Sequence, residues 1–249
     1  MASPRYQIVL KEKRQLSPST MELTYLREDK GAIAYLPGQF FSIDFLHQGE
    51  EKSRSYSAAG RIDDLRSNKE FCFAITAVPE GAASHYFFNT KPGDHAKMSG
   101  PFGALILPRT DPLRYLLIGT GTGVAPYRAM LPELERRMQV NPELKVVLVM
   151  GVRSPQDLIY GTEFEAMAQC YPGFSFHACY SRQMPDSPQA HEHFGRVKLL
   201  FEQLKPDPVQ DMVYLCGNPD MVDESVVWFS EKGFSVKNLK SEKYKFSAF

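Results

Sequence analysis

The segment Gly119–Val124 alternates glycine and threonine in a way that suits a bound phosphate. It reads Gly-Thr-Gly-Thr-Gly-Val, follows the apolar run Leu116–Ile118 and opens a helix-like segment with Pro126 near its start. Glycines let the backbone turn sharply and approach an anion, and the free amides of a helix N-terminus attract that anion. Proline is tolerated there because the first amides of a helix have no intrahelical partner. The pattern predicts a phosphate-binding turn, and a turn required only for packing is the alternative.

This turn differs from the plain dinucleotide-binding fingerprint Gly-x-Gly-x-x-Gly. Counted from Gly121, the third glycine position holds Pro126. The next predicted strand ends in Gly151-Val152-Arg153, which offers no carboxylate to a ribose hydroxyl. The sequence therefore disfavours an ordinary NAD-dependent dehydrogenase domain.

A second group of polar side chains lies at Arg54-Ser55-Tyr56-Ser57. An arginine can bind a pyrophosphate through two parallel hydrogen bonds, a tyrosine ring can stack on another flat ring, and a nearby hydroxyl can bond a ring nitrogen. Further on, Gly81-Ala82-Ala83-Ser84 opens a short helix-like stretch. Taken without the rest of the chain, the alternate positions of Arg54 and Tyr56 equally indicate the exposed face of a strand.

The hydrophobic pattern that must position these groups changes near residue 108. Up to about residue 107, short apolar runs such as 40–46 and 71–78 are separated by turn residues, which predicts a small antiparallel barrel or sandwich. Beyond the proline-containing segment 108–112, continuous apolar runs alternate with helix-like segments, as in βαβ units on a parallel sheet. We therefore predict a β domain over residues 1–108, followed by a Rossmann-like α/β domain over residues 109–249.

Composition excludes several classes of protein. The 249 residues are 43% hydrophobic and 23% charged, which allows real cores and excludes disorder. The 29 basic residues are balanced by 29 acidic ones, so no nucleic-acid footprint is expected. No run approaches the roughly 18 apolar residues of a membrane span, and the start carries no apolar signal region. The four cysteines are far apart, which argues against a zinc or iron–sulfur site. We expect a cytoplasmic monomer without a bound metal.

Together these motifs resemble the ferredoxin–NADP reductase superfamily of flavoproteins. The resemblance covers nearly the whole chain. The segments that carry it are Pro37-Gly38-Gln39-Phe40, Arg54–Ser57, Gly81–Ser84, Gly100-Pro101-Phe102-Gly103, Gly119–Pro126, Gly151-Val152-Arg153 with Asp157-Leu158-Ile159-Tyr160, and Tyr214-Leu215-Cys216-Gly217-Asn218-Pro219. The resemblance implies a six-stranded flavin-binding barrel followed by a five-stranded parallel sheet that holds the nicotinamide nucleotide.

For the first domain the resemblance implies bound FAD, with FMN as the less favoured flavin. Arg54 would meet the flavin pyrophosphate, Tyr56 would stack against the isoalloxazine, and Ser57 would lie within hydrogen-bonding reach of N5. Gly81–Ser84 would cap the phosphates with backbone amides and the Ser84 hydroxyl.

For the second domain the resemblance implies that Cys216 lies near the nicotinamide C4 and positions it rather than attacking it. A small residue that closes a buried strand is the alternative. The ending Glu242-Lys243-Tyr244 is also similar to the family, so Tyr244 would cover the second face of the flavin, with Phe246 or Phe249 as substitutes. An aromatic ring in that place must leave before nicotinamide can stack, so the tail would act as a gate. Glu242 would relay protons or pair with a lysine.

Nucleotide preference depends on Ser181 and Arg182, which follow the third strand of this domain, and on Arg196. A hydroxyl with guanidinium groups suits the 2′-phosphate of NADP, so NADPH is favoured over NADH. A long insertion between the two arginines could move Arg196 away. Its histidines, His191 and His193, fit solvated side chains better than metal ligands.

The expected site contains one set of cofactor-binding residues and a smaller catalytic set. The cofactor-binding set is Arg54, Ser55, Tyr56, Ser57, Gly81, Ala82, Ala83, Ser84, Gly119, Thr120, Gly121, Thr122, Gly123, Pro126, Arg153, Ser181, Arg182, Arg196, Cys216, Gly217, Tyr244 and Phe249. The catalytic set is Ser57, Cys216, Glu242 and Tyr244.

The implied activity is electron transfer between NADPH and a separate ferredoxin or flavodoxin through FAD N5. The carrier would be another chain, because this one lacks iron–sulfur cysteines. The reductase component of an oxygenase and a free-flavin reductase are the alternatives, and a flavin-free interaction module is the non-enzymatic one. Four lysines and one acid between residues 237 and 245 would steer an acidic carrier or form a solvated tail.

Overall fold

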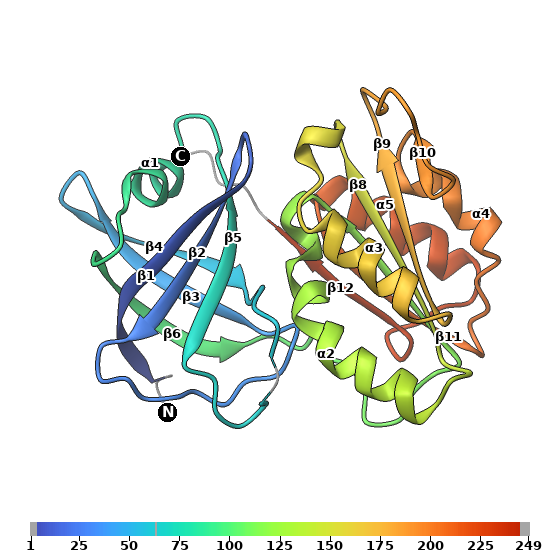
Figure 1. The fold of residues 1–249 in the computed structure, drawn as a ribbon, viewed down its shortest axis with the longest axis horizontal. Helices are drawn as coiled ribbons and strands as arrows, with labels where there is room; N and C mark the ends of the chain where they lie inside the picture. Colours follow the sequence, from blue (N-terminus) through green and yellow to red (C-terminus); the bar gives the residue numbers. More distant parts are fainter. Residues whose placement is uncertain (1–3, 63, 245–249) are drawn as a thin grey trace. The chain divides into compact units, whose positions relative to one another are not determined.

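The computed structural model describes residues 4–62 and 64–244, which fall into two compact units (Figure 1). The first unit holds the chain up to Leu107 together with Ala125–Pro132. The second holds Pro108–Val124 and, among the described residues, those from Glu133 to Tyr244. Helix α2, Ala125–Val140, therefore has residues in both units. The domain boundary near residue 108 stays a prediction.

The first unit is built on a six-stranded antiparallel sheet in the order β4-β3-β6-β1-β2-β5. Its elements are β1 Arg5–Ser17, β2 Thr20–Arg27, β3 Phe40–His47, β4 Glu50–Ser57, β5 Glu70–Thr76, α1 Ala82–Asn89 and β6 His95–Phe102. A bridge between Ala58, which directly follows β4, and Phe73 in the middle of β5 joins the two edge strands, so the sheet closes on itself as a barrel. The predicted antiparallel barrel is confirmed.

Alternation of side chains explains why these segments form strands around one core. On β3, Phe41, Ile43 and Phe45 are buried while the residues between them are half-buried. The rings of Phe71 and Phe73 on β5 lie 5.7 and 6.1 Å from that of Phe41. These aromatic contacts fill the barrel and fix the strands that carry the polar motif of β4.

The second unit is built on a six-stranded parallel sheet in the order β10-β9-β8-β7-β11-β12. Its strands are β7 Arg114–Thr120, β8 Lys145–Val152, β9 Phe174–Tyr180, β10 Glu192–Phe194, β11 Asp211–Gly217 and β12 Leu239–Lys243. Its other elements are the α-helices α3 Gly161–Cys170, α4 Phe201–Leu204 and α5 Pro219–Glu231, and the 3-10 helices η1 Gly121–Val124, η2 Pro155–Asp157 and η3 Val197–Leu200. Helix α3 lies on one face of the sheet, and α4 and α5 lie on the other (Figure 1).

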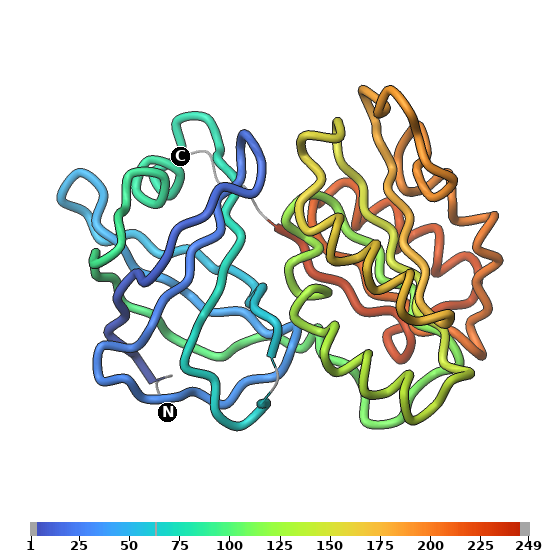
Figure 2. The backbone as a smooth tube through the Cα atoms, in the orientation of Figure 1, coloured from blue at the N-terminus to red at the C-terminus, as the bar shows by residue number. Residues whose placement is uncertain are grey.

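The predicted parallel sheet is confirmed, with six strands where the resemblance implied five. β10 has only three residues, Glu192–Phe194, and none of them is buried, so no apolar run in the sequence predicts this strand. Figure 2 follows the backbone to the last strand, β12, which pairs with β11 and extends the sheet beyond β7. No helix in the described part of the chain is long and apolar enough to cross a membrane.

Candidate functional site

The Arg54–Ser57 motif forms the end of β4, at an edge of the barrel sheet. The ring of Tyr56 packs edge-on against that of Phe87 in α1, with centroids 5.4 Å apart at 89°. Burial raises the pKa of the Tyr56 phenol, so the ring stays neutral. Ser57 is buried on the opposite face of the strand, and Arg54 is half-buried. The motif thus offers a fixed, neutral aromatic ring beside a guanidinium.

The Gly81–Ser84 segment forms the N-terminus of α1, which carries no side-chain cap and no acid in its first turn. The Ser84 hydroxyl oxygen accepts a hydrogen bond from the Val78 amide at 2.6 Å, which folds the preceding loop onto the helix. A Cβ on Gly81 would lie 3.1 Å from the Val78 carbonyl oxygen and 3.2 Å from Ser84 Oγ. The tight fold leaves the first helical amides and the Ser84 proton to serve a phosphate, so these residues fit a flavin pyrophosphate.

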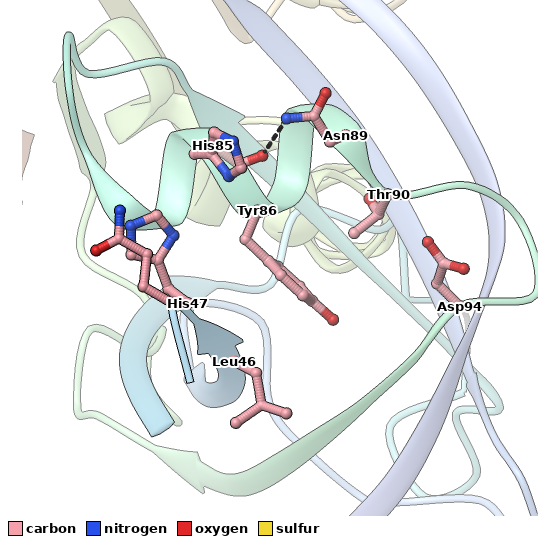
Figure 3. A pocket seen from close by; sticks show the side chains of 8 residues that line it. Leu46, His47, His85, Tyr86, Asn89, Thr90 and Asp94 are labelled. Atoms are coloured by element: carbon pink, nitrogen blue, oxygen red, sulfur yellow. Dashed lines mark hydrogen bonds between the residues drawn. The ribbon is translucent and has the colours of Figure 1, made fainter. Parts of the chain in front are cut away.

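A pocket of about 310 Å³ lies farther along α1 and is shown in Figure 3. Its lining comprises Leu46, His47, Gln48, His85, Tyr86, Asn89, Thr90 and Asp94. The rings of His47 and His85 meet edge to face with centroids 5.3 Å apart, and the Asn89 amide donates to the His85 carbonyl at 2.7 Å. None of the predicted site residues lines this pocket, so we assign it no part in the flavin site.

The glycine-rich turn of the second unit consists of the end of β7 and the short helix η1. A Cβ on Gly123 would lie 2.2 Å from the Cys216 carbonyl oxygen, so glycine is required there for packing against β11. Gly121 has a φ of +53°, and a Cβ on it would meet nothing within 4 Å. The side of the turn at Gly121 is therefore open to an anion. Helix α2 begins just beyond it, with Pro126 in its first turn and no acid there.

Thr120 ties this turn to the loop that follows β11. Its hydroxyl oxygen accepts a hydrogen bond from the Asn218 amide at 2.9 Å. Gly217 has a φ of +125°, and a Cβ on it would lie 2.5 Å from Thr120 Oγ1. Gly119 pairs with Cys216 in the sheet. Two motifs that are distant in the sequence thus form one platform at the ends of neighbouring strands.

Cys216, Glu242 and Tyr244 are brought together at the same strand ends. Cys216 pairs with Glu242 in the β11–β12 ladder, and the Tyr244 amide donates to the Gly217 carbonyl at 2.8 Å. The Cys216 side chain is fully buried. Burial, reinforced by the nearby Glu242 charge, raises the pKa of the thiol well above its usual value, although a Tyr244 hydrogen bond opposes this. A thiol that stays protonated is a packing group and not a nucleophile.

Alkylation should therefore distinguish the four cysteines. Burial raises the pKa of Cys72 and of Cys179 to about 12, and it also raises the pKa of Cys216. Cys170, in contrast, is exposed. A thiol of pKa 12 is about 0.01% thiolate at pH 8, and only the thiolate reacts. Native protein treated with iodoacetamide at pH 8 should carry label on Cys170 alone, as read by peptide mass spectrometry, and unfolded protein should carry it on all four. Labelling of native Cys216 at the rate of Cys170 would contradict this assignment.

Three exposed arginines follow three adjacent strands of the second unit. Arg153 follows β8, Arg182 follows β9 and Arg196 follows β10. Because these strands are parallel, their carboxyl ends share one edge of the sheet. The Arg182 amide donates to the Arg153 carbonyl at 2.9 Å. The Ser181 hydroxyl donates to the Val152 carbonyl at 3.2 Å, so it faces the backbone here.

The insertion before Arg196 returns the chain to this same edge. Phe194 of β10 pairs with Tyr180 of β9, and the Gly195 amide donates to the Tyr180 carbonyl at 2.8 Å. Arg196 therefore leaves the sheet beside the residues that follow β9. This placement supports a role beside Ser181 and Arg182.

The histidines of the insertion find partners that the sequence did not indicate. His193 Nε2 lies 3.1 Å from Nδ1 of His177 on β9, and His191 Nε2 lies 3.4 Å from a Glu165 oxygen. Burial, followed by the other histidines, lowers the pKa of His177 and of His193. Within residues 4–62 and 64–244, no three His, Cys, Asp or Glu side chains gather in a way that could hold a metal ion.

Two of the C-terminal lysines already have partners. Lys243 forms an ion pair with Asp223, and Lys240 Nζ lies 5.7 Å from the centroid of the Tyr214 ring. The predicted positive strip is therefore partly engaged within the second unit. Phe246 and Phe249, the substitutes predicted for Tyr244, lie outside the residues that the structure describes.

Comparison with known proteins identifies both units. The model of the oxidoreductase FAD-binding domain matches residues 7–106, and that of the oxidoreductase NAD-binding domain matches residues 117–226. The toluate 1,2-dioxygenase electron transfer component of Pseudomonas putida is 32% identical over 244 residues, which cover 98% of this chain and 68% of that protein. Ferredoxin–NADP reductase B of Sorangium cellulosum is 31% identical over 213 residues, which cover 84% of each chain.

A solved structure agrees in fold. The ferredoxin NADP+ reductase of Neisseria gonorrhoeae, with bound FAD and NADP, superposes with a TM-score of 0.81 at 19% identity, over 98% of this chain and 99% of that one. The antiparallel barrel, the parallel sheet and the two family models all indicate the same two-domain flavoprotein fold. The chain therefore belongs to the ferredoxin–NADP reductase family of flavoprotein oxidoreductases, with a FAD-binding domain followed by a domain that binds a nicotinamide nucleotide.

Proposed function

We propose that this enzyme oxidises NADPH and passes the electrons one at a time to a separate ferredoxin or flavodoxin. The observation that carries the choice of NADPH is the row of exposed arginines Arg153, Arg182 and Arg196 at one sheet edge. A phosphate monoester beside guanidinium groups gains charge-assisted, bidentate hydrogen bonds that NADH cannot make. When bound, FAD supplies the redox chemistry, because a flavin accepts a hydride and releases electrons singly.

In the first unit, the chain's residues bind and orient the flavin. Arg54 and the amides of Gly81–Ser84 neutralise the pyrophosphate. Tyr56, held by Phe87, provides a neutral ring for stacking. Ser57 provides a hydroxyl for N5.

In the second unit, the residues of the strand ends hold the nucleotide. The open side of Gly121 and the start of α2 receive the pyrophosphate, while Arg182 and Arg196 receive the 2′-phosphate. Cys216 keeps a protonated thiol, which would pack against the nicotinamide without attacking it once Tyr244, its hydrogen-bond partner, moves away. Glu242, which pairs with Cys216 in the strand ladder, would hold an exchangeable proton at this end of the sheet, and Tyr244 would cover the bound flavin in the absence of the nicotinamide. We also propose that the protein acts as a cytoplasmic monomer, for which its free, widely spaced cysteines support a reducing compartment.

The reductase component of an oxygenase is the second candidate. The observation that favours it is the 32% identity to a dioxygenase electron transfer component over nearly the whole chain. In that case the oxygenase partner replaces the soluble carrier, and the residues assigned above keep their roles.

One set of turnover measurements tests the proposal. Purified protein should be yellow, and kcat/KM for NADPH should exceed that for NADH by about tenfold or more. Ferredoxin, flavodoxin, an oxygenase component and free FMN are compared as acceptors. Preference for NADH would overturn the nucleotide assignment, and efficient turnover with free FMN alone would overturn the separate carrier.

Ser57→Ala tests the role assigned to the flavin motif. Loss of one hydrogen bond to N5 should slow flavin reduction about tenfold or more, while FAD remains bound because Arg54 and the α1 amides are intact. Anaerobic stopped flow at 450 nm measures the rate, and gel filtration measures FAD retention. An unchanged reduction rate would remove Ser57 from the catalytic residues.

A further inference from the structure

A buried charged network in the first unit has no part in the binding roles proposed above. Arg128, near the start of α2, donates to Glu22 Oε2 at 3.1 Å, and these side chains are only 12% and 9% exposed. Arg14 donates to Glu22 Oε1 at 2.6 Å. Glu22 therefore carries an arginine on each carboxylate oxygen. Desolvating such a pair is costly, and removing one partner of it is costlier still.

The same guanidinium also reaches the chain just beyond the flavin motif. Arg128 Nη1 donates to the Ala59 carbonyl at 3.0 Å. Ala59 lies two residues after Ser57, and its own amide donates to the Cys72 carbonyl on β5 at 2.8 Å. One side chain thus joins β2, the continuation of β4 and the first turns of α2.

Arg128 lies close in the sequence to the glycine-rich turn, so its contacts with Glu22 and Ala59 bear on the position of that turn. Helix α2 begins at Ala125, directly after the phosphate-binding turn Gly119–Val124. The segment Ala125–Pro132 belongs to the first unit, and Arg128 lies in its middle. Pro132 lacks the amide proton that a helix would donate to the Arg128 carbonyl. The anchored segment therefore lies between the turn and a break in the helical hydrogen bonding.

We propose that Arg128 is a positioning residue for hydride transfer. Its ion pair with Glu22 holds the start of α2 on the flavin-binding unit, and the phosphate-binding turn is joined to that anchor by the chain itself. This inference rests on the proposed function, which assigns the turn to the nucleotide. Reaction rates fall about a hundredfold when reacting groups are misplaced by about 1 Å, even if each ligand still binds. Arg128 should thus affect the rate of flavin reduction more than it affects binding.

Arg128→Ala and Arg128→Lys test this, with Arg137→Ala as the matched control. Arg137 is on the same helix, is 17% exposed, and pairs with Glu133 at 2.7 Å and Asp111 at 2.5 Å, all in the second unit. Arg128→Ala should retain FAD and bind NADP+ within about twofold of the parent. Its flavin reduction by saturating NADPH should be slower by about tenfold or more in anaerobic stopped flow. Arg128→Lys should recover part of the rate, and Arg137→Ala should stay within about twofold of the parent.

The outcomes separate positioning from binding and from general destabilisation. A parental rate in Arg128→Ala, a loss that disappears at saturating NADPH, or an equal loss in Arg137→Ala would each overturn the inference. If Arg128→Ala does not fold, Glu22→Gln is judged by the same criteria, because it removes the charge and leaves one acceptor oxygen where Glu22 offers two. Dithionite, which needs no nucleotide, should reduce the variants and the parent equally. A parent that binds FAD but is not reduced by NADPH would instead contradict the proposed function.

Discussion

Gly123→Ala is expected to abolish flavin reduction by NADPH and to lower the melting temperature by about 5 °C or more. The added Cβ would lie 2.2 Å from the Cys216 carbonyl oxygen, 2.6 Å from the Cys216 carbonyl carbon and 2.7 Å from the Gly217 Cα. All three are backbone atoms of a strand paired on both sides, so no side-chain rotation relieves the overlap. Turn and strand must separate, which misplaces the turn and Cys216 together. Calorimetry and stopped flow measure the two effects.

Gly121→Ala is the control for this change. A Cβ there meets nothing within 4 Å, and only the left-handed φ of +53° is unfavourable, at about 1 kcal/mol. We expect a melting temperature that falls by no more than about 4 °C and a raised KM for NADPH, because the new methyl group lies on the open side of the turn. Equal destabilisation by both substitutions would show that contact with β11 is not what requires glycine at position 123.

Gly121 and Gly123 differ in what can be predicted of them from the sequence. The turn was predictable because its glycines, the buried strand before it and the helix after it are local features. The requirement for glycine at position 123 was not predictable, because the atoms that exclude a Cβ there belong to the Cys216 backbone, which is distant in the sequence. The packing alternative thus accounts for Gly123, whereas the phosphate interpretation stays a prediction for the open side of the turn at Gly121.

The same distinction explains what the sequence missed. Strand β10 has no apolar run, so pairing with β9, and hence the place of Arg196, emerges only from the sheet register. The ion pair between Arg128 and Glu22 joins a helix from the region of alternating strands and helices to a strand from the region of short apolar runs. Neither residue is unusual within its own segment. A buried charge is recognised only when the surface that covers it is known.

The arginine row carries the second large expected effect, on nucleotide preference. Arg182→Ala removes one guanidinium from the edge where β8, β9 and β10 end. A hydrogen bond to a charged group contributes about 1.5–3 kcal/mol, which corresponds to roughly 10–150-fold in binding. KM for NADPH should therefore rise by about tenfold or more, while KM for NADH, which lacks the 2′-phosphate, should change by less than about twofold. Steady-state rates with both nucleotides measure this directly.

Added salt and a second variant distinguish recognition of the 2′-phosphate by Arg182 from a general attraction of the nucleotide to positive charge. Arg109→Ala removes an exposed arginine of the same unit outside the strand ends, so it should leave the preference for NADPH unchanged. Added salt screens exposed ion pairs, so the advantage of NADPH in the parent should shrink with ionic strength while KM for NADH changes little. Equal rises of KM for both nucleotides in Arg182→Ala would mean that Arg182 supports the fold of the edge or binds a part common to both. The 2′-phosphate would then have to be held elsewhere, or the enzyme would use NADH.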